Sequence, residues 1–287
     1  MSKNGRHKVL VLGSRGLVGH QVFNELAKDT ENYKVFGTLR GYNEFDSQIL
    51  NEGGEKILVQ DLRCPTELQL LLNRLKPHSI VNCLSIASHK TASERNLERT
   101  FSLLPQMLAK MAKQKQARVV NISSDAVFSG KATLAYSEKN IPDAMDHYGK
   151  AKIHGEVGAK NVVNLRASLI GFDPYKKSGL LENFLASESF TPHSNSIFSA
   201  LPAKKFAIII KQMVLPRNDI SGTFHVGSKP ISKSDCLRLI AKHLGHSVNL
   251  LNDDSVVMNR ALDTRLFEMT TGYRAQTWQQ LVSFVSD

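Results

Sequence analysis

The sequence has little cysteine and no long run of apolar residues. Its three cysteines, Cys64, Cys83 and Cys236, are far apart and have no CxxC or His-rich companion. This odd number and spacing indicate neither a disulfide framework nor a zinc site, so we expect buried or half-buried thiols and no metal. No window approaches the roughly 20 apolar residues of a spanning helix, and residues 1–8 lack the apolar centre of a secretory signal. We therefore expect a cytoplasmic protein with no membrane partner.

Clustered charge is also missing, although the chain is basic overall. The 37 Lys and Arg residues outnumber the 26 Asp and Glu residues, which gives a formal net charge of +11. The basic residues are dispersed and no nucleic-acid-binding module is recognisable, so we expect no nucleic-acid partner. A positive field of this kind favours phosphorylated cofactors and nucleotide-linked substrates. At 287 residues, 41% of them hydrophobic, the chain can bury a substantial core.

The first part of the chain alternates between short apolar runs and segments of helical periodicity. Such alternation indicates an α/β fold with a parallel sheet that is covered by helices on both faces. The predicted strands are residues 9–12, 33–39, 57–60, 79–84, 118–122 and 162–166, and the predicted helices are residues 17–27, 67–75, 97–115 and 143–158.

The rhythm changes after residue 166. Residues 168–199 are rich in Gly, Ser, Pro, Phe and Asn, which favours irregular loops that face a substrate. A helix over 204–214, a strand over 222–226 and a helix over 232–244 with Ser232 as N-cap follow. We predict a Rossmann-type, doubly wound parallel sheet in residues 1–166 that binds a dinucleotide. Residues 167–287 would form a smaller substrate-binding lobe, with about 200–228 returning to the first domain.

A glycine-rich turn follows the first predicted strand. A tight turn of this kind brings backbone N–H groups close to a pyrophosphate at a helix N-terminus, where the helix dipole favours negative charge. The motif alone is weak evidence, because short glycine motifs also occur by chance, and it gains weight from the Tyr148–Lys152 segment far downstream. The predicted cofactor residues of this turn are Gly13, Ser14, Arg15, Gly16, Leu17, Val18 and Gly19.

Tyr148 and Lys152 are four residues apart, so on a helix their side chains share one face. An ammonium near the phenol, together with the positive charge of an oxidised nicotinamide, would lower the pKa of Tyr148 from its ordinary value of about 10. Tyr148 could then protonate a carbonyl oxygen while hydride reaches the carbon, and Lys152 could hold the nicotinamide ribose. The alternative is an ordinary pair on a helix surface.

Ser124 strengthens the catalytic interpretation. It follows the predicted strand 118–122, at the carboxyl edge where ligands bind in open α/β sheets. A hydroxyl there could hydrogen-bond a substrate carbonyl and direct it toward Tyr148. The alternative for the Ser-Ser-Asp segment is a capping cluster. Three polar groups in this order make Ser124, Tyr148 and Lys152 our candidate catalytic residues.

The cofactor preference follows from the end of the second predicted strand. NAD sites tend to place a carboxylate about 20 residues after the glycine turn, to bind the ribose 2′-OH. Here Arg40 ends the strand, and together with Arg15 it would suit a 2′-phosphate. We therefore predict NADPH. Glu44 and Asp46 lie nearby and keep NADH open as the alternative.

These motifs resemble the extended short-chain dehydrogenase/reductases and, within them, the dTDP-4-dehydrorhamnose reductase family. The resemblance covers nearly the whole chain and includes segments that a generic Rossmann domain has no reason to contain. The matching segments are residues 13–19, 61–62, 123–130, 136–138, 148–152, 166–168, 197–202, 222–227 and 259–263.

The resemblance implies reduction of the 4-keto group of a nucleotide-linked 4-keto-6-deoxy sugar, for surface polysaccharide or glycoside biosynthesis. Ser124, Tyr148 and Lys152 match the catalytic set of the family. Two further groups match positions around the ligands. On the cofactor side these are Asp61, Leu62, Cys83, Leu84 and Ser85. On the substrate side they are Ser124, Asp125, Val127, Phe128, Arg166, Phe198 and Arg260.

Arg166 and Arg260 are candidates for phosphate contacts, because the guanidinium offers a fork of donors to phosphate oxygens. A salt bridge to Asp263 is the alternative for Arg260. The sequence leaves open which nucleotide and which sugar are bound, and whether the helices beside the sheet form a homodimer.

The chain departs from the family pattern at three positions. Ser124 and Ala167 stand where the family usually has Thr, and Ser124 keeps the hydroxyl. Phe101 stands where the family commonly has an Asn that supports the active-site backbone or a water. This departure motivates a second hypothesis, a non-catalytic NADP-binding regulatory subunit. A related epimerase or dehydratase with bound NAD is a third. Such enzymes usually need further acid or base groups near Ser124, and Asp125-Ala126 supplies no convincing partner.

Overall fold

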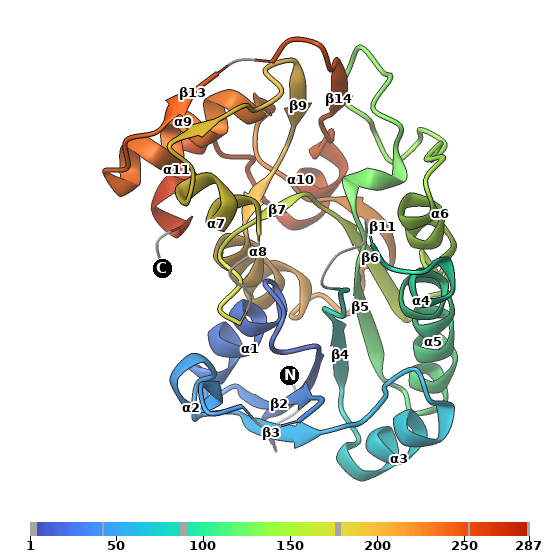
Figure 1. The fold of residues 1–287 in the computed structure, drawn as a ribbon. Coiled ribbons are helices and arrows are strands. Elements are labelled where there is room, and N and C mark those ends of the chain that lie inside the picture. The colour runs from blue at the N-terminus through green and yellow to red at the C-terminus, as the bar shows by residue number, and fades with distance from the viewer. Residues whose placement is uncertain (1–4, 42, 87–90, 176–178, 252, 286–287) are drawn as a thin grey trace.

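The computed structural model describes residues 5–41, 43–86, 91–175, 179–251 and 253–285. Within these residues a seven-stranded sheet forms the centre, in the order β11-β6-β5-β4-β1-β2-β3, and all its strands are parallel (Figure 1). The order reverses between β1 and β4, and ligands bind beyond the carboxyl ends of strands at such a point. The strands are β1 (His7–Leu12), β2 (Tyr33–Leu39), β3 (Glu55–Leu58), β4 (Ser79–Asn82), β5 (Arg118–Ile122), β6 (Val162–Arg166) and β11 (Gly222–His225).

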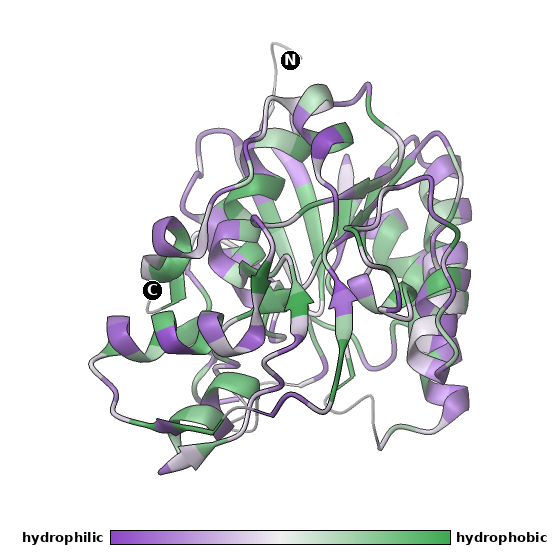
Figure 2. Cartoon of the chain, turned by 90° about the horizontal axis from the view of Figure 1, so that it is seen from above, coloured by the Kyte–Doolittle hydropathy of each residue, from purple (hydrophilic) through white to green (hydrophobic). Residues whose placement is uncertain are grey.

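Helices cover both faces of this sheet, as the alternating residues of β1 show. Val9 and Val11 belong to the core under α1 (Gly19–Ala27) and α8 (Ala203–Ile209). Leu10 and Leu12 belong to the core under α3 (Pro65–Leu75) and α5 (Leu104–Gln114). Successive side chains of a strand point to opposite faces, so both faces are buried. Hydrophobic colour accordingly concentrates on the central strands (Figure 2). The predicted doubly wound α/β fold is confirmed.

Two predicted helices differ from the structure in their bounds. The segment predicted as one helix over 97–115 contains α4 (Glu94–Glu98), a π-helical turn η1 (Arg99–Leu103) and α5. Pro105 lies in the first turn of α5, where its missing N–H costs least. The helix predicted over 143–158 is α6 (His147–His154), because Asp146 caps it by accepting a hydrogen bond from the Gly149 amide at 2.9 Å.

A second group of elements packs around its own core, beyond the carboxyl ends of the main sheet (Figure 1). Ser232 caps α9 by accepting a hydrogen bond from the Asp235 amide at 3.0 Å, which confirms the predicted N-cap. The principal elements are α7 (Leu180–Leu185), β9 (Ser196–Phe198), β12 (Ile231–Ser232), α9 (Lys233–Leu244), β14 (Met258–Arg260) and α11 (Trp278–Leu281).

Short elements complete the chain, and several lie in the segment predicted as irregular. These are α2 (Asp46–Ile49), η2 (Asp125–Val127), β7 (Leu169–Ile170), β8 (Ser189–Phe190), β10 (Leu201–Pro202), η3 (Ile210–Val214), β13 (Asn249–Leu250), α10 (Arg265–Thr271) and η4 (Val282–Val285).

The chain returns to the main sheet after β9, since α8 packs on α1 and β11 pairs with β6. The predicted division into two domains at residue 166 stays a prediction. In the part of the chain that the structure describes, no helix combines the length and apolar character needed to cross a membrane. Over the same residues, no group of three or more His, Cys, Asp or Glu could hold a metal ion.

Candidate active site

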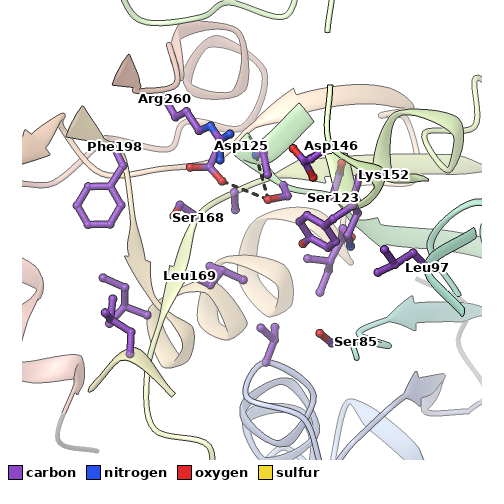
Figure 3. A pocket seen from close by; sticks show the side chains of 18 of the residues that line it. Ser85, Leu97, Ser123, Asp125, Asp146, Lys152, Ser168, Leu169, Phe198 and Arg260 are labelled. Carbon is purple, nitrogen blue, oxygen red and sulfur yellow. Dashed lines mark hydrogen bonds between the residues drawn. The ribbon is translucent and has the colours of Figure 1, made fainter. Parts of the chain in front are cut away.

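A cleft of about 740 Å³ opens where the carboxyl ends of the main sheet face the second group of elements (Figure 3). Many of the predicted site residues line it, although they come from distant parts of the sequence. From the predicted set, the lining includes Val18, Cys83, Leu84, Ser85, Ser124, Asp125, Tyr148, Lys152, Phe198 and Arg260.

The glycine-rich turn between β1 and α1 can hold a pyrophosphate. Gly13 has φ +75°, a conformation that side-chain-bearing residues rarely adopt. A Cβ at Gly19 would lie 2.0 Å from the Gly13 carbonyl oxygen, so only glycine allows this packing. The Ser14 hydroxyl points into the protein, where it donates to the Thr38 carbonyl at 3.0 Å. The turn therefore offers its backbone, rather than the Ser14 side chain, to a ligand.

Arg15, in the glycine-rich turn, is already paired and does not line the cleft. Its Nε donates to Asp46 Oδ1 at 2.8 Å, and its Nη2 contacts the other carboxylate oxygen. The Tyr175 hydroxyl donates to the same Asp46 Oδ1 at 2.7 Å. Burial opposes ionisation of Asp46, but the hydrogen bonds from Arg15 and Tyr175 outweigh it and lower its pKa to about 2. Arg40 follows β2 and is exposed, without lining the cleft.

Asp61 and Leu62, predicted near the adenine, lie just after β3 and outside the cleft lining. Asp61 Oδ1 accepts a hydrogen bond from Arg63 Nε at 2.7 Å, and Arg99 lies 3.6 Å from the other oxygen. Leu62 is buried in the core under α3. Leu62 could therefore meet a ligand only through its backbone.

Tyr148 lies near the start of α6, half-buried at the wall of the cleft. Its phenol is hydrogen-bonded to the Ser124 side chain. Burial raises the pKa of Tyr148 to about 12, and its hydrogen bond with Ser124 offsets only part of this effect. The lowering of this pKa by Lys152 together with an oxidised nicotinamide concerns the cofactor-bound site and stays a prediction. A protonated phenol is the state that a proton donor needs.

Lys152 lies one turn further along α6, on the same side as Tyr148, as the spacing predicted. Its Nζ donates to the Ile122 carbonyl at 2.9 Å and lies 4.3 Å from the centre of the Phe101 ring. Nζ is 5.9 Å from the centre of the Tyr148 ring. Burial lowers the pKa of Lys152 to about 8, although the Glu156 carboxylate favours the charged form. Lys152 thus remains largely protonated at neutral pH.

Asp125 lies beside Ser124 and faces the cleft (Figure 3). The Ser124 hydroxyl donates to Asp125 Oδ1 at 3.1 Å, and the Ser168 side chain is also hydrogen-bonded to this carboxylate. Burial raises the pKa of Asp125, while the positive charges of Arg260 and Lys233 counteract part of that rise. The cleft therefore contains a carboxyl group that takes up a proton more readily than an ordinary aspartate.

Three of the predicted substrate residues lie in the protein interior instead. Val127 and Phe128 are fully buried, because the chain turns back into the core after Asp125 at η2, and Phe128 stacks on Tyr136 at 4.0 Å between ring centres. Arg166 is also buried, and its Nε and Nη2 donate to the Glu156 carboxylate at 2.8 and 2.6 Å. These three side chains do not line the cleft, so we remove them from the candidate substrate site.

Phe198 and Arg260 occupy paired positions on β9 and β14 and form one wall of the cleft. Arg260 Nε is buried and, among the described residues, has no hydrogen-bond partner. The alternative salt bridge to Asp263 is wrong, because Asp263 binds Arg265, with 2.9 Å between Nε and Oδ2. Arg260 therefore keeps a donor group for a ligand.

Sequence reasoning missed several polar residues of this cleft, which are Ser123, Asp146, His147, Ser168, Ser196 and Lys233. Lys233 had a usable signal, because a basic residue in the first turn of a helix lies at the end where the dipole disfavours it. Ser168 sits in the segment 166–168 that carries the family resemblance, but nothing in its spacing distinguishes it from an ordinary loop serine.

A family model described as the RmlD substrate binding domain matches residues 7–170. The chain belongs to this family. The match confirms the resemblance to dTDP-4-dehydrorhamnose reductases within the extended short-chain dehydrogenase/reductases. A reductase of that name from Salmonella typhimurium is 31% identical over 98 residues, which are 33% of each protein.

A second kind of relative also matches this member of the RmlD family. The methionine adenosyltransferase 2 subunit beta of Xenopus laevis is 30% identical over 154 residues, which are 52% of this chain and 41% of that protein. The match thus spans about two fifths of the length of such relatives. Among solved structures, dTDP-4-dehydrorhamnose reductase from Bacillus anthracis in complex with NADP superposes with a TM-score of 0.79. That alignment has 19% identity and covers 98% of this chain and 99% of the other.

Proposed function

We propose that this protein is an NADPH-dependent reductase of the 4-keto group of a nucleotide-linked 4-keto-6-deoxy sugar. The observation that carries the proposal is the convergence of Ser124, Tyr148 and Lys152 on one cleft, with the glycine turn beside it. Membership of the RmlD family and the NADP named for the B. anthracis structure support the same activity. The proposed enzyme is an oxidoreductase that acts on a CH–OH group.

The residues around the glycine turn fit a dinucleotide. Gly13, Gly16 and Gly19 let the turn pack tightly against its own backbone and the residues after β4. A pyrophosphate would then lie against the N-terminus of the nine-residue helix α1. Cys83, Leu84 and Ser85 follow β4 and line the floor toward Lys152. When bound, the nicotinamide supplies hydride to the substrate carbonyl carbon.

The protein side chains would manage the proton and the orientation of the substrate. Tyr148 donates its phenolic proton to the carbonyl oxygen. The raised pKa of about 12 keeps the phenol protonated at neutral pH, and nearby positive charge would have to ease release of the proton. Ser124 hydrogen-bonds the same oxygen and aligns it with the phenol. Lys152, held by the Ile122 carbonyl, contributes positive charge that stabilises the developing tyrosinate and holds the nicotinamide ribose.

The polar wall of the cleft suits the nucleotide part of the substrate. Arg260 Nε has no hydrogen-bond partner among the described residues, and Lys233 adds a second positive charge near Asp125. Both the guanidinium of arginine and the ammonium of lysine bind phosphate oxygens. Phe198 offers an aromatic face beside Arg260 on the neighbouring strand.

The test is NADPH oxidation with dTDP-, UDP- and GDP-linked 4-keto-6-deoxy sugars, with NADH for comparison. We expect turnover with one nucleotide class, and a loss of about 100-fold to 10,000-fold in Tyr148→Phe because the general acid is removed. Tyr33→Phe is the matched control, since Tyr33 lies on β2 away from the cleft lining. Unchanged turnover in Tyr148→Phe contradicts the proposed role of the phenol.

A non-catalytic NADP-binding regulatory subunit is the second candidate. The 30% identity to a protein named as a subunit of methionine adenosyltransferase 2 favours it. The Phe101 ring beside the Lys152 ammonium is a second observation in its favour, because this ring stands where the family commonly has an Asn that supports the active site. Tight NADPH binding without oxidation across the whole sugar panel would support this candidate over the reductase.

A further inference from the structure

Three side chains form a continuous hydrogen-bonded series from the cleft to the phenol. The Asp125 carboxylate accepts from the Ser124 hydroxyl at 3.1 Å, and the Ser124 side chain is hydrogen-bonded to the Tyr148 phenol. The Ala126 amide donates to Ser124 Oγ at 3.1 Å and fixes its position. Asp125 is only half-buried and lines the cleft, so it can exchange protons with solvent.

The opposite side of the phenol and ammonium is apolar. Phe101 is 4% exposed and meets Tyr148 edge-to-face, with 5.2 Å between ring centres and an interplanar angle of 90°. The same ring covers the Lys152 ammonium at 4.3 Å. Leu97 and Ala151 pack with Phe101 in one hydrophobic cluster. A proton that travels through side chains to Tyr148 from this direction would have to cross hydrocarbon.

We propose that Asp125 resupplies the proton of Tyr148 through the Ser124 hydroxyl, while Phe101 closes the route past Lys152. This inference rests on the proposed reductase function and names the source of its proton. Four groups face the Asp125 carboxylate and set its charge state: Arg260 of β14, Lys233 of α9, and the hydroxyls of Ser124 and Ser168.

The proton balance of the step is complete. The carbonyl carbon of the substrate gains hydride and is reduced, and its oxygen takes the phenolic proton of Tyr148. The phenolate oxygen takes the Ser124 proton, and Ser124 Oγ takes the proton of the Asp125 carboxyl. Each O–H bond that breaks is matched by one that forms. Solvent in the cleft then protonates Asp125 again.

A titration of the protein without cofactor or substrate tests the carboxyl directly. Carbon-13 NMR of the aspartate side chains should show one carboxyl that titrates above the ordinary value of 3.8 and vanishes from the spectrum of Asp125→Asn. Titration of Asp125 at or below 3.8 overturns the proposal. This result does not depend on finding the sugar substrate.

Kinetics then test the route of the proton. We expect Asp125→Asn to slow NADPH-dependent reduction about 100-fold at neutral pH, at the lower end of general acid catalysis, and to remove the Asp125 ionisation from the pH profile. Ser124→Ala removes the hydroxyl and should lose both the rate and the Asp125 ionisation in the profile, and Ser124→Thr, which restores a hydroxyl, should bring that ionisation back relative to Ser124→Ala. Asp235→Asn is the matched control, because Asp235 accepts from the Ser232 hydroxyl at 2.7 Å outside the cleft.

The outcomes separate this inference from the proposed function. A wild-type protein that reduces none of the sugars contradicts the reductase, while the NMR titration still decides whether Asp125 carries the required proton. A wild-type enzyme that turns over, with an Asp125→Asn variant of equal rate and identical pH profile, overturns the proton route alone.

Discussion

Two arginine–carboxylate pairs of similar geometry lie in regions with different tasks. Arg166 and Glu156 join the end of β6 to the segment after α6, and their side chains are 5% and 8% exposed. Arg15 and Asp46 lie beside the glycine turn, and there the arginine is 26% exposed. Both guanidinium groups bind the two oxygens of one carboxylate. Because solvent reaches Arg15 but not Arg166, we infer that a ligand can replace Asp46 as the partner of Arg15, whereas the Arg166–Glu156 pair is structural.

The buried Arg166–Glu156 pair is connected to the end of the cleft that contains Ser124. Glu156 Oε1 also accepts from the Ser123 hydroxyl at 2.6 Å, and Ser123 precedes Ser124 in the chain. The pair at the glycine turn instead contacts Tyr175 from the segment after β7. We infer that the Arg166–Glu156 pair fixes the position of the chain at Ser123 and Ser124. We infer that Asp46, in the other pair, keeps the Arg15 guanidinium from binding a ligand.

The largest expected effect comes from breaking the buried pair. Glu156→Ala leaves the Arg166 guanidinium buried without its carboxylate, and this should lower the free energy of unfolding by about 3–5 kcal/mol. Asp46→Ala should lower it by about 1 kcal/mol, because solvent reaches Arg15 and can replace part of the lost interaction. Urea unfolding of both variants measures the two losses. Equal losses would contradict the distinction between the pairs.

The sequence predicted the sheet well, and it predicted that Ser124, Tyr148 and Lys152 lie at one site, because those signals are local. Strand 118–122 ends two residues before Ser124, and the four-residue spacing places Tyr148 and Lys152 on one side of α6. Backbone chemistry determined the glycine turn in the same way, since a Cβ at Gly19 would overlap the Gly13 carbonyl.

The partners of the charged side chains could not be read from the sequence. Arg166 was expected at the substrate, but its carboxylate lies ten residues earlier in the chain and reaches it only through the β6–α6 packing. The Tyr175–Asp46 contact spans 129 residues. Such pairings depend on tertiary geometry, which neither periodicity nor motif spacing contains.

Lys152 contrasts with the two arginine pairs, because its ammonium donates to the neutral backbone carbonyl of Ile122 rather than to a carboxylate. Burial lowers its pKa from 10.5 to about 8 in the folded state, so between these values the unfolded state binds more protons. Stability from this group therefore rises with pH from about 8 to 10.5, and the penalty is full below 8. Lys152→Met should raise the free energy of unfolding by about 2 kcal/mol over wild type at pH 7. This stabilisation should shrink as the pH rises from about 8 to 10.5.

Thermal melts at several pH values measure this gain. Lys150→Met is the matched control, because Lys150 is on the same helix and exposed, and its effect should not change through the window. A gain for Lys152→Met that stays constant with pH would show that the ammonium carries no burial penalty.

The Arg15–Asp46 pair leads to a prediction about cofactor binding. Asp46→Asn removes the charge that holds Arg15 and should tighten NADPH binding about tenfold, or about 1.4 kcal/mol, with little change for NADH. The reason is that a freed guanidinium can bind the 2′-phosphate, which NADH lacks. Calorimetric titration measures both affinities. Asp29→Asn is the control, because Asp29 pairs with Lys211 at 3.2 Å away from the cleft. Equal tightening for both cofactors would exclude a role at the 2′-phosphate.

The smallest effect concerns Tyr175, which reaches Asp46 from the far side of the glycine turn. Its hydroxyl contributes one hydrogen bond of 2.7 Å to a carboxylate that Arg15 also holds. Tyr175→Phe removes this bond but keeps an aromatic ring under the Arg15 guanidinium, which lies 5.3 Å from the ring centre. NADPH should therefore bind only about threefold more tightly, which is within the worth of a single hydrogen bond. Combined with Asp46→Asn it should add nothing, since the two variants act on the same pair. An additive double variant would mean that Tyr175 meets the cofactor itself, and the control of Arg15 would then belong to Asp46 alone.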